Sequence, residues 1–229
     1  MPETVIPSVV VPSRTEAVLD AVRRAILTGR LVPGRPLVET ELAAQLGVSK
    51  TPVREALKTL AGAGLVTISP YKGAAVRTVD DVLARSVYDI RLLLEPEAVR
   101  RSASRGGGGA ATAANAWEAA AQALDLADRA ADAAERQQAN RDFHRALYAG
   151  CGNDLMVTIL DGLRDQTALV ATTVWTRNAG WDREAAEHRA VLGAITADRP
   201  DTAARLLEEH IRTFVERNFG PGESAHATR

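Results

Sequence analysis

Cysteine is nearly absent from this chain of 229 residues, which contains only Cys151. A single cysteine cannot form an internal disulfide, so the disulfide-stapled folds of small secreted proteins are excluded and a reducing compartment is favoured. Cys151 falls near the expected end of a helix, where we interpret it as an inert structural residue. Long apolar runs are also missing, because no stretch approaches the ~20 residues that a membrane-spanning helix needs.

The N-terminal residues lack the basic segment of a signal peptide and are interrupted by Pro7 and Pro12. We expect residues 1–13 and 220–229 to be disordered, as chain ends often are. These features, with the missing membrane segment, favour a cytoplasmic protein.

Aromatic residues make up only 4% of the chain, and alanine dominates its second half, which favours helices over sheets. Charge is spread unevenly. Residues 1–80 contain 10 basic and 7 acidic residues, whereas residues 81–229 contain 18 and 22. A modestly basic module followed by an acidic one fits a nucleic-acid binder with a separate regulatory domain. The difference is small and supports this interpretation only together with the motifs below.

Residues 14–78 show the pattern of three short helices and a β-hairpin. Apolar residues recur at helical spacing over 14–28 and in a second helix that we expect to end at Gly47. A third helix is expected to start at Thr51 as N-cap, with Pro52 in its first turn. The residues expected to face the core are Val38, Leu42, Ala43 and Leu46 in the second helix, and Val53, Ala56, Leu57 and Leu60 in the third.

Three basic residues remain on the outer side of the third helix. Lys50, Arg54 and Lys58 stand four residues apart, so their charges align along one face. The β-prone segments 65–68 and 74–78 follow, and the loop between them ends in Lys72 and Gly73. A basic helix held by another helix and followed by a hairpin is the arrangement that enters a DNA major groove. The alternative is that the basic face is only solvated.

The strings ELAAQLGVSKTPVREAL and GLVTISPYKGAAV resemble the winged helix-turn-helix of GntR-type bacterial transcription regulators. The resemblance implies that Lys50 and Arg54 read base edges, with a preference for guanine O6 and N7. It implies that Ser49 and Thr51 bond phosphates near the helix N-terminus, and that Lys72 and Gly73 reach the minor groove. Two positions depart from the family pattern: Thr40 stands where a basic residue is frequent, and Val38 where a serine N-cap is usual.

From Val79 onward the sequence reads as helices near 79–104, 110–127, 130–150, 153–178, 182–198 and 200–219, with no β-pattern. The expected fold is therefore mainly α: an N-terminal winged helix-turn-helix over 14–78 and a C-terminal all-α helical bundle over 79–219. Three histidines in the bundle fall on different helices: His144, which follows Asn140 by one turn, His188 and His210. Each alone is more often a structural or surface residue, but three imidazoles that converge in a bundle bind a divalent metal.

The segments RLLLEPEA, NRDFHRALYAGCGN, EHRAVLGAI and LLEEHI resemble the FCD ligand-binding domain of the FadR-like branch of GntR regulators. The resemblance implies that His144, His188 and His210 ligate a divalent metal, with zinc or nickel favoured. Asn140 stands at the position of an acidic fourth ligand, and its neutral amide oxygen is a weaker ligand than a carboxylate. An open coordination position would suit a small carboxylate effector, which Arg91 could bind. The alternative for Arg91 is an internal ion pair with Glu95.

These features predict a ligand-responsive transcription regulator, usually a repressor, that binds a near-palindromic double-stranded DNA operator as a homodimer in the bacterial nucleoid. Two other classes remain as alternatives. One is a metal or metabolite sensor that acts through protein partners. The other is a three-histidine metalloenzyme with a metal-bound water as nucleophile, although no general acid or base motif accompanies the histidines.

Overall fold

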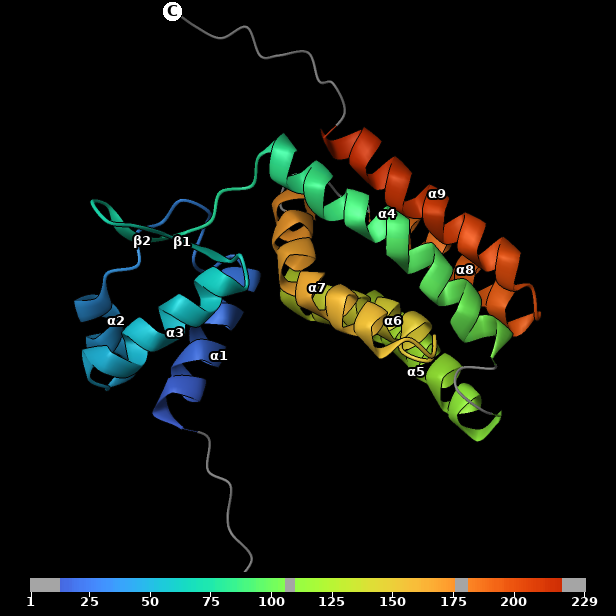
Figure 1. Ribbon diagram of the computed structural model, residues 1–229, viewed down its shortest axis with the longest axis horizontal. Helices are drawn as coiled ribbons and strands as arrows, with labels where there is room; N and C mark the ends of the chain where they lie inside the picture. The colour runs from blue at the N-terminus through green and yellow to red at the C-terminus, as the bar shows by residue number, and fades with distance from the viewer. Residues whose placement is uncertain (1–12, 106–109, 176–180, 220–229) are drawn as a thin grey trace, which may run out of the picture. The chain divides into compact units, whose positions relative to one another are not determined.

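The computed structural model of the chain describes residues 13–105, 110–175 and 181–219 (Figure 1). The disorder expected for residues 1–12 and 220–229 concerns segments outside this description. The chain divides into two compact units, and the change from one to the other falls between Arg77 and Thr78; the short segment Leu27–Gly29 is grouped with the second unit.

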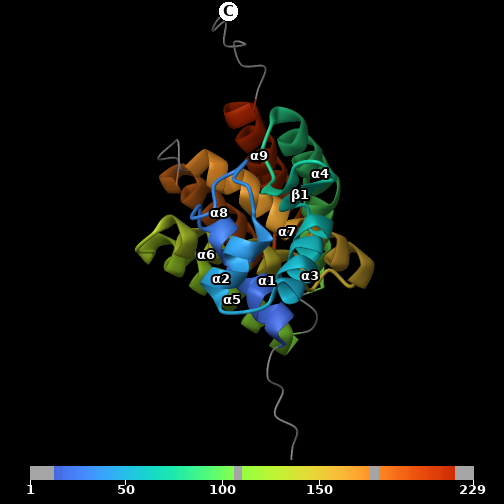
Figure 2. The same ribbon diagram turned by 90° about the vertical axis from the view of Figure 1, so that its left-hand side faces the viewer.

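The N-terminal unit contains three helices and one hairpin: α1 (Arg14–Leu27), α2 (Glu39–Leu46), α3 (Lys50–Gly62), β1 (Val66–Ser69) and β2 (Gly73–Val76). The strands are antiparallel, and their register pairs Val66 with Val76 and Ser69 with Gly73. Figure 2 views this unit from the side, with α2 and α3 beneath the hairpin. Its core is built from the apolar faces of α1 and α3 together with Leu65, which precedes β1; the helical residues are Val18, Val22, Ile26, Val53, Ala56, Leu57 and Leu60.

Several details of this unit differ from the sequence predictions. Val38 and Leu46 were expected to face the core, but they are 42% and 37% exposed. The reason is that α2 has only eight residues, so its two turns bury only Leu42 and Ala43. The N-cap of α3 is Ser49 and not Thr51, and the strands are displaced from the predicted ranges by one or two residues. The prediction for Gly47 is confirmed, because it ends α2 with φ 65° and ψ 34°, in the left-handed region that glycine tolerates best.

The described residues of the C-terminal unit form six helices: α4 (Asp81–Ser104), α5 (Ala110–Arg129), α6 (Ala133–Tyr148), α7 (Asp154–Trp175), α8 (Trp181–Thr196) and α9 (Pro200–Phe219). Asp80 caps α4 by accepting a hydrogen bond from the backbone N–H of Leu83, and Asp132 caps α6 in the same way. Helix α4 continues through Pro96. The predicted mainly α fold, with a two-stranded wing after the N-terminal helices, is confirmed for the described residues.

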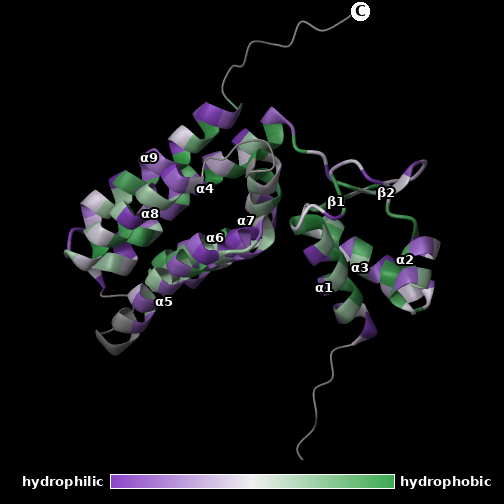
Figure 3. Ribbon diagram, turned by 180° about the vertical axis from the view of Figure 1, so that it is seen from behind, coloured by the Kyte–Doolittle hydropathy of each residue, from purple (hydrophilic) through white to green (hydrophobic). Residues whose placement is uncertain are grey.

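The core of the bundle is mainly apolar. Hydrophobic residues alternate with hydrophilic ones along each helix (Figure 3), which is the pattern of amphipathic helices around a shared core. Tyr88 of α4 stacks on Phe214 of α9, with 4.8 Å between the ring centroids. Helices α4, α6, α8 and α9 also bury charged and imidazole side chains, among them Glu95, His144, His188 and His210. None of the helices in the described part of the chain is long and apolar enough to cross a membrane.

Candidate DNA-binding face and metal centre

The outer face of α3 carries the basic residues that the sequence singled out. Lys50, Arg54 and Lys58 are exposed, whereas the opposite face of the helix is buried against the core. Ser49 and Thr51 are exposed at the N-terminus of α3, where free backbone N–H groups favour anions. In the wing, Lys72 and Gly73 are exposed at the start of β2, and Gly73 has φ +71°, a conformation that a residue with a side chain rarely adopts.

A groove of about 440 Å³ lies between α3, the start of α2 and the wing. Arg54, Lys58, Lys72 and Gly73 line it, together with the apolar residues Pro36, Leu37, Val38, Leu57, Ile68 and Ala74 and one acid, Glu39. The helix face and the wing tip therefore belong to one basic concave surface. Such a surface suits the phosphate backbone of a nucleic acid.

Arg54 is not free on this surface. Its Nε lies 3.0 Å from Oε1 of Glu39, and its Nη2 lies 2.7 Å from Oε2, so the two groups form a bidentate ion pair. Hydrogen bonds from Arg54 lower the pKa of Glu39, which keeps the carboxylate ionised. The sequence analysis did not single out Glu39. An acid in the first turn of a helix is also the ordinary complement of the helix dipole, so nothing local pointed to a partner 15 residues away.

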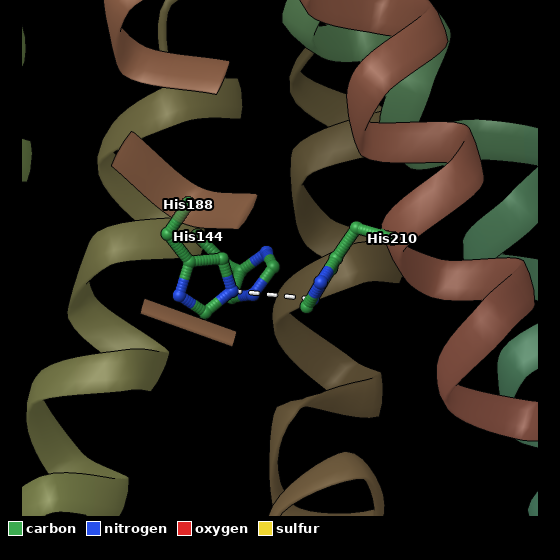
Figure 4. Close-up of side chains that lie close together, drawn as sticks. All are labelled: His144, His188 and His210. Atoms are coloured by element: carbon green, nitrogen blue, oxygen red, sulfur yellow. Dashed lines mark hydrogen bonds between the residues drawn. The ribbon is translucent and has the colours of Figure 1, made fainter. Parts of the chain in front are cut away.

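In the bundle, three buried histidines converge from three helices. One ring nitrogen of each of His144 (α6), His188 (α8) and His210 (α9) lies within 4.8 Å of the other two. Figure 4 shows the three side chains gathered together, with a dashed line between His188 and His210. The Nε2 atoms of these two rings are 3.1 Å apart. Two nitrogens that bind one metal at 2.0–2.1 Å are typically about 3–3.4 Å apart. The His188–His210 pair already has this spacing.

Two carboxylates orient the rings from outside. His144 Nδ1 lies 2.6 Å from Glu95 Oε1, and His210 Nδ1 lies 2.7 Å from Glu187 Oε2. Since these Nδ1 atoms are engaged, the Nε2 atoms of both rings remain for a ligand. A carboxylate behind a histidine fixes the ring and makes its other nitrogen a better metal ligand.

The protonation of the rings also suits metal binding. Burial lowers the pKa of His144 to about 4, although the nearby Glu95 opposes this effect. Burial, together with the other two histidines, lowers the pKa of His188 well below its usual value. Both rings are therefore neutral near pH 7, and neutral imidazole is the form that binds metal ions.

Arg91 forms the internal ion pair that the sequence offered as an alternative. Its Nε lies 2.7 Å from Glu95 Oε2, and both side chains are buried. Its guanidinium also lies over the ring of Tyr88, 4.8 Å from the ring centroid. Burial disfavours the charged form of Glu95, but Arg91 and His144 outweigh this and lower the pKa of its carboxyl well below the usual range. Glu95 thus links the predicted effector residue to a predicted metal ligand.

A small cavity of about 30 Å³ adjoins this pair. Its lining comes from α4, α6 and α7 and comprises Arg91, Glu95, Asn140, Arg141, His144, Tyr148, Leu160, Arg164 and Thr167. Asn140 Oδ1 and Thr167 Oγ1 are buried without a hydrogen-bond partner in the described residues. Buried polar atoms are rarely left unsatisfied, so these two favour a bound polar group. The three converging imidazoles fit a divalent transition metal, which would supply a Lewis-acidic position for an oxygen ligand, and Asn140 lines the cavity beside one of them, His144.

Comparisons with known proteins agree with both halves of this description. Residues 14–76 match the family described as "Bacterial regulatory proteins, gntR family", and residues 86–213 match the FCD domain. A probable D-xylose utilization operon transcriptional repressor from Paenarthrobacter nicotinovorans is 30% identical over 86% of this chain and 85% of that protein. The HTH-type transcriptional repressor GlaR of Escherichia coli K12 is 28% identical over 83% of this chain and 89% of its own length.

A solved structure also matches along nearly the whole chain. The crystal structure of a GntR transcriptional regulator from Rhodococcus sp. RHA1 is 25% identical, has a TM-score of 0.77, and covers 92% of this chain and 99% of its own. These relatives are transcription regulators and not enzymes, which excludes the metalloenzyme alternative. The chain belongs to the GntR family of bacterial DNA-binding transcription regulators and carries an FCD domain after its helix-turn-helix.

Proposed function

We propose that this protein is a repressor of the FadR-like branch, in which residues 14–78 bind an operator and residues 79–219 bind a small carboxylate effector at or near a divalent metal. The observation that carries this proposal is the pairing of an exposed basic helix with a separate bundle that buries three converging histidines. Such a protein acts in the cytoplasm, on DNA of the nucleoid. Effector binding shifts the DNA-competent population only if it favours one bundle arrangement over another.

The operator itself can be obtained by selection from random duplex DNA, which tests the proposal directly. We expect recovery of an inverted repeat, and an affinity that falls steeply with salt because basic side chains displace counterions from phosphates. Addition of a divalent metal and then of a small carboxylate should change the affinity for the selected duplex. Recovery of no sequence preference at any salt concentration would refute the operator-binding role.

On the DNA face, we assign Lys50 and Arg54 to base edges, Ser49 and Thr51 to phosphates, Lys58 to the flanking backbone, and Lys72 and Gly73 to the minor groove. Replacing Arg54 by alanine is expected to cost about 1–3 kcal/mol of operator affinity and to relax the base preference at one position. Binding would be measured by fluorescence anisotropy on the selected duplex. Arg205→Ala is the control, because it removes the same charge from an exposed site on α9 and should leave affinity unchanged.

In the bundle, His144, His188 and His210 would hold the metal, with zinc or nickel favoured, and Asn140 Oδ1 would complete the set. The neutral amide makes this site weaker than one with a carboxylate. Arg91 is already paired with Glu95. A carboxylate effector would therefore have to accept hydrogen bonds from the N–H donors of Arg91 that Glu95 does not use. The small cavity beside Arg91 supports a compact ligand rather than a long-chain one.

A homodimer is supported by an apolar face that the bundle leaves exposed. On α4, Val82, Ile90 and Leu93 share one side of the helix, and Leu93 is 77% exposed. On the neighbouring α7, Leu155 and Ile159 are exposed one turn apart. Exposed apolar patches of this kind mark interfaces, and a second copy would place two recognition helices on the two halves of a palindrome.

Leu93→Glu is expected to weaken dimerisation by at least about tenfold, because it buries an unpaired charge in the proposed interface. Light scattering after size exclusion would show the loss of dimer at micromolar concentration, and operator affinity should fall with it. Leu126→Glu on α5 makes the same change at another exposed leucine and should leave the mass unchanged. Equal masses for wild type and Leu93→Glu would place the interface elsewhere.

A further inference from the structure

The ion pair between Glu39 and Arg54 joins two helices on the DNA-binding face. Glu39 begins α2, Arg54 lies in the second turn of α3, and both line the basic groove. The side chains are 33% and 56% exposed, so the pair is open to solvent and contributes little to the stability of the fold. Its geometry is nevertheless well defined, because two parallel hydrogen bonds fix the guanidinium plane.

The pairing uses only one edge of the guanidinium. An arginine side chain carries five N–H donors, one on Nε and two on each terminal nitrogen. Glu39 takes the Nε donor and one Nη2 donor. One Nη2 donor and both Nη1 donors therefore remain, and of these three the Nη2 donor and one Nη1 donor form the end-on pair of the guanidinium. An end-on pair can donate two parallel hydrogen bonds to O6 and N7 of a guanine.

The negative charge of Glu39 lies within the groove where DNA phosphates would approach. Among the described residues that line the groove, Glu39 is the only acid, and Arg54, Lys58 and Lys72 supply positive charge there. A carboxylate at this place repels DNA phosphates. It also offsets the positive charge of Arg54, which weakens the attraction between the guanidinium and any phosphate within its reach. An acid in a DNA-binding groove thus lowers affinity for DNA of arbitrary sequence.

We infer that Glu39 is a positioning residue for operator recognition: it holds Arg54 with its end-on donors free for one guanine and penalises binding through phosphates alone. This inference rests on the proposed role of Arg54 as a base reader. Glu39 then increases the difference in affinity between the operator and other DNA, while it lowers the affinity of the protein for DNA in general. Without it, the flexible Arg54 side chain can bond any nearby phosphate.

The test compares Glu39→Gln with Glu55→Gln, using the full-length protein. Glu55 is the matched control, since it pairs with Lys58 on the same helix as Arg54, and its substitution removes the same charge without breaking a hydrogen bond of Arg54. The probes are the duplex selected by the wild type, the same duplex with one guanine–cytosine pair replaced, and a scrambled duplex. Repeating the selection from random DNA with each variant, with Arg54→Ala included, gives the base preference by position.

Glu39→Gln is expected to bind the scrambled duplex more tightly and to lower the ratio of selected to scrambled affinity by about tenfold. It should lose preference at the position that Arg54→Ala also loses, and the double variant should lose no more. Glu55→Gln should keep the wild-type preference at that position. Thermal unfolding of Glu39→Gln should match the wild type, which separates positioning from a structural role.

Two outcomes would overturn the inference. In one, Glu39→Gln keeps the wild-type affinity ratio within about twofold while Arg54→Ala changes base preference. In the other, the two variants lose preference at different positions. If Arg54→Ala itself leaves every preference intact, the proposed function of Arg54 fails first, and the role inferred for Glu39 fails with it.

Discussion

Replacing Glu95 by alanine is expected to destabilise the helical bundle by about 3–5 kcal/mol, the cost of leaving a buried charge without its partner. Glu95 is 2% exposed and neutralises Arg91, which is only 6% exposed. The same carboxylate also orients His144. Its removal therefore leaves an uncompensated guanidinium in the core and a histidine without its hydrogen-bond acceptor.

Urea unfolding followed by tryptophan fluorescence would measure this loss. All three tryptophans, Trp117, Trp175 and Trp181, lie in the C-terminal part of the sequence, so their emission reports on that unit. A chelator in the buffer would remove any contribution from bound metal. Glu97→Ala is the control, because Glu97 lies on the same helix but pairs with Arg100 and Arg101 at the surface, where such pairs contribute about 0–1 kcal/mol. Equal urea midpoints for the Glu95 and Glu97 variants would contradict the assigned role of the buried pair.

Most of the fold could be predicted from the sequence because its determinants are local. Amphipathic spacing and breaks such as Gly47 act within a few residues, and they located nine helices and the hairpin of the described chain with small errors at the ends. The errors arose where local rules compete. Both Ser49 and Thr51 are good N-caps, and the structure uses the first. Leu46 satisfies the helical period, but α2 is too short to bury it.

The candidate metal site could be predicted only in part from local sequence patterns. Spacing placed His144, His188 and His210 on three helices, but only resemblance to FCD domains suggested that they meet. No sequence pattern indicated that Glu95 and Glu187 would hydrogen-bond to His144 and His210. Glu187 is next to His188 in the sequence, yet neighbouring helical residues point about 100° apart, and Glu187 bonds His210 on α9 instead.

For Arg91, the sequence did not decide between two possible partners. These partners are an effector carboxylate and Glu95, and both are carboxylates that a guanidinium binds in the same way. The ion pair with Glu95 is formed in the structure. Binding of a carboxylate effector by Arg91 stays a prediction, because one guanidinium can serve an internal acid and an external one at the same time.

Replacing His188 by alanine is expected to abolish stoichiometric metal binding. His188 is fully buried, and its Nε2 lies 3.1 Å from that of His210. Structural zinc sites are worth about 10–16 kcal/mol over four ligands, so loss of one ligand should cost about 3 kcal/mol, or more than a hundredfold in affinity. Dialysis against limiting zinc or nickel followed by elemental analysis would measure the change.

The control for this change must leave a void in the core beside the same helix without removing a ligand. Val191→Ala does so, since Val191 is also fully buried and lies one turn further along α8. It should lose stability, as core truncations do, but keep its metal. Circular dichroism would confirm that both variants remain helical. If His188→Ala retained as much metal as the wild type while Val191→Ala behaved as expected, the three histidines would be a hydrogen-bonded core cluster, and effector binding would have to rest on Arg91 and the adjoining cavity alone.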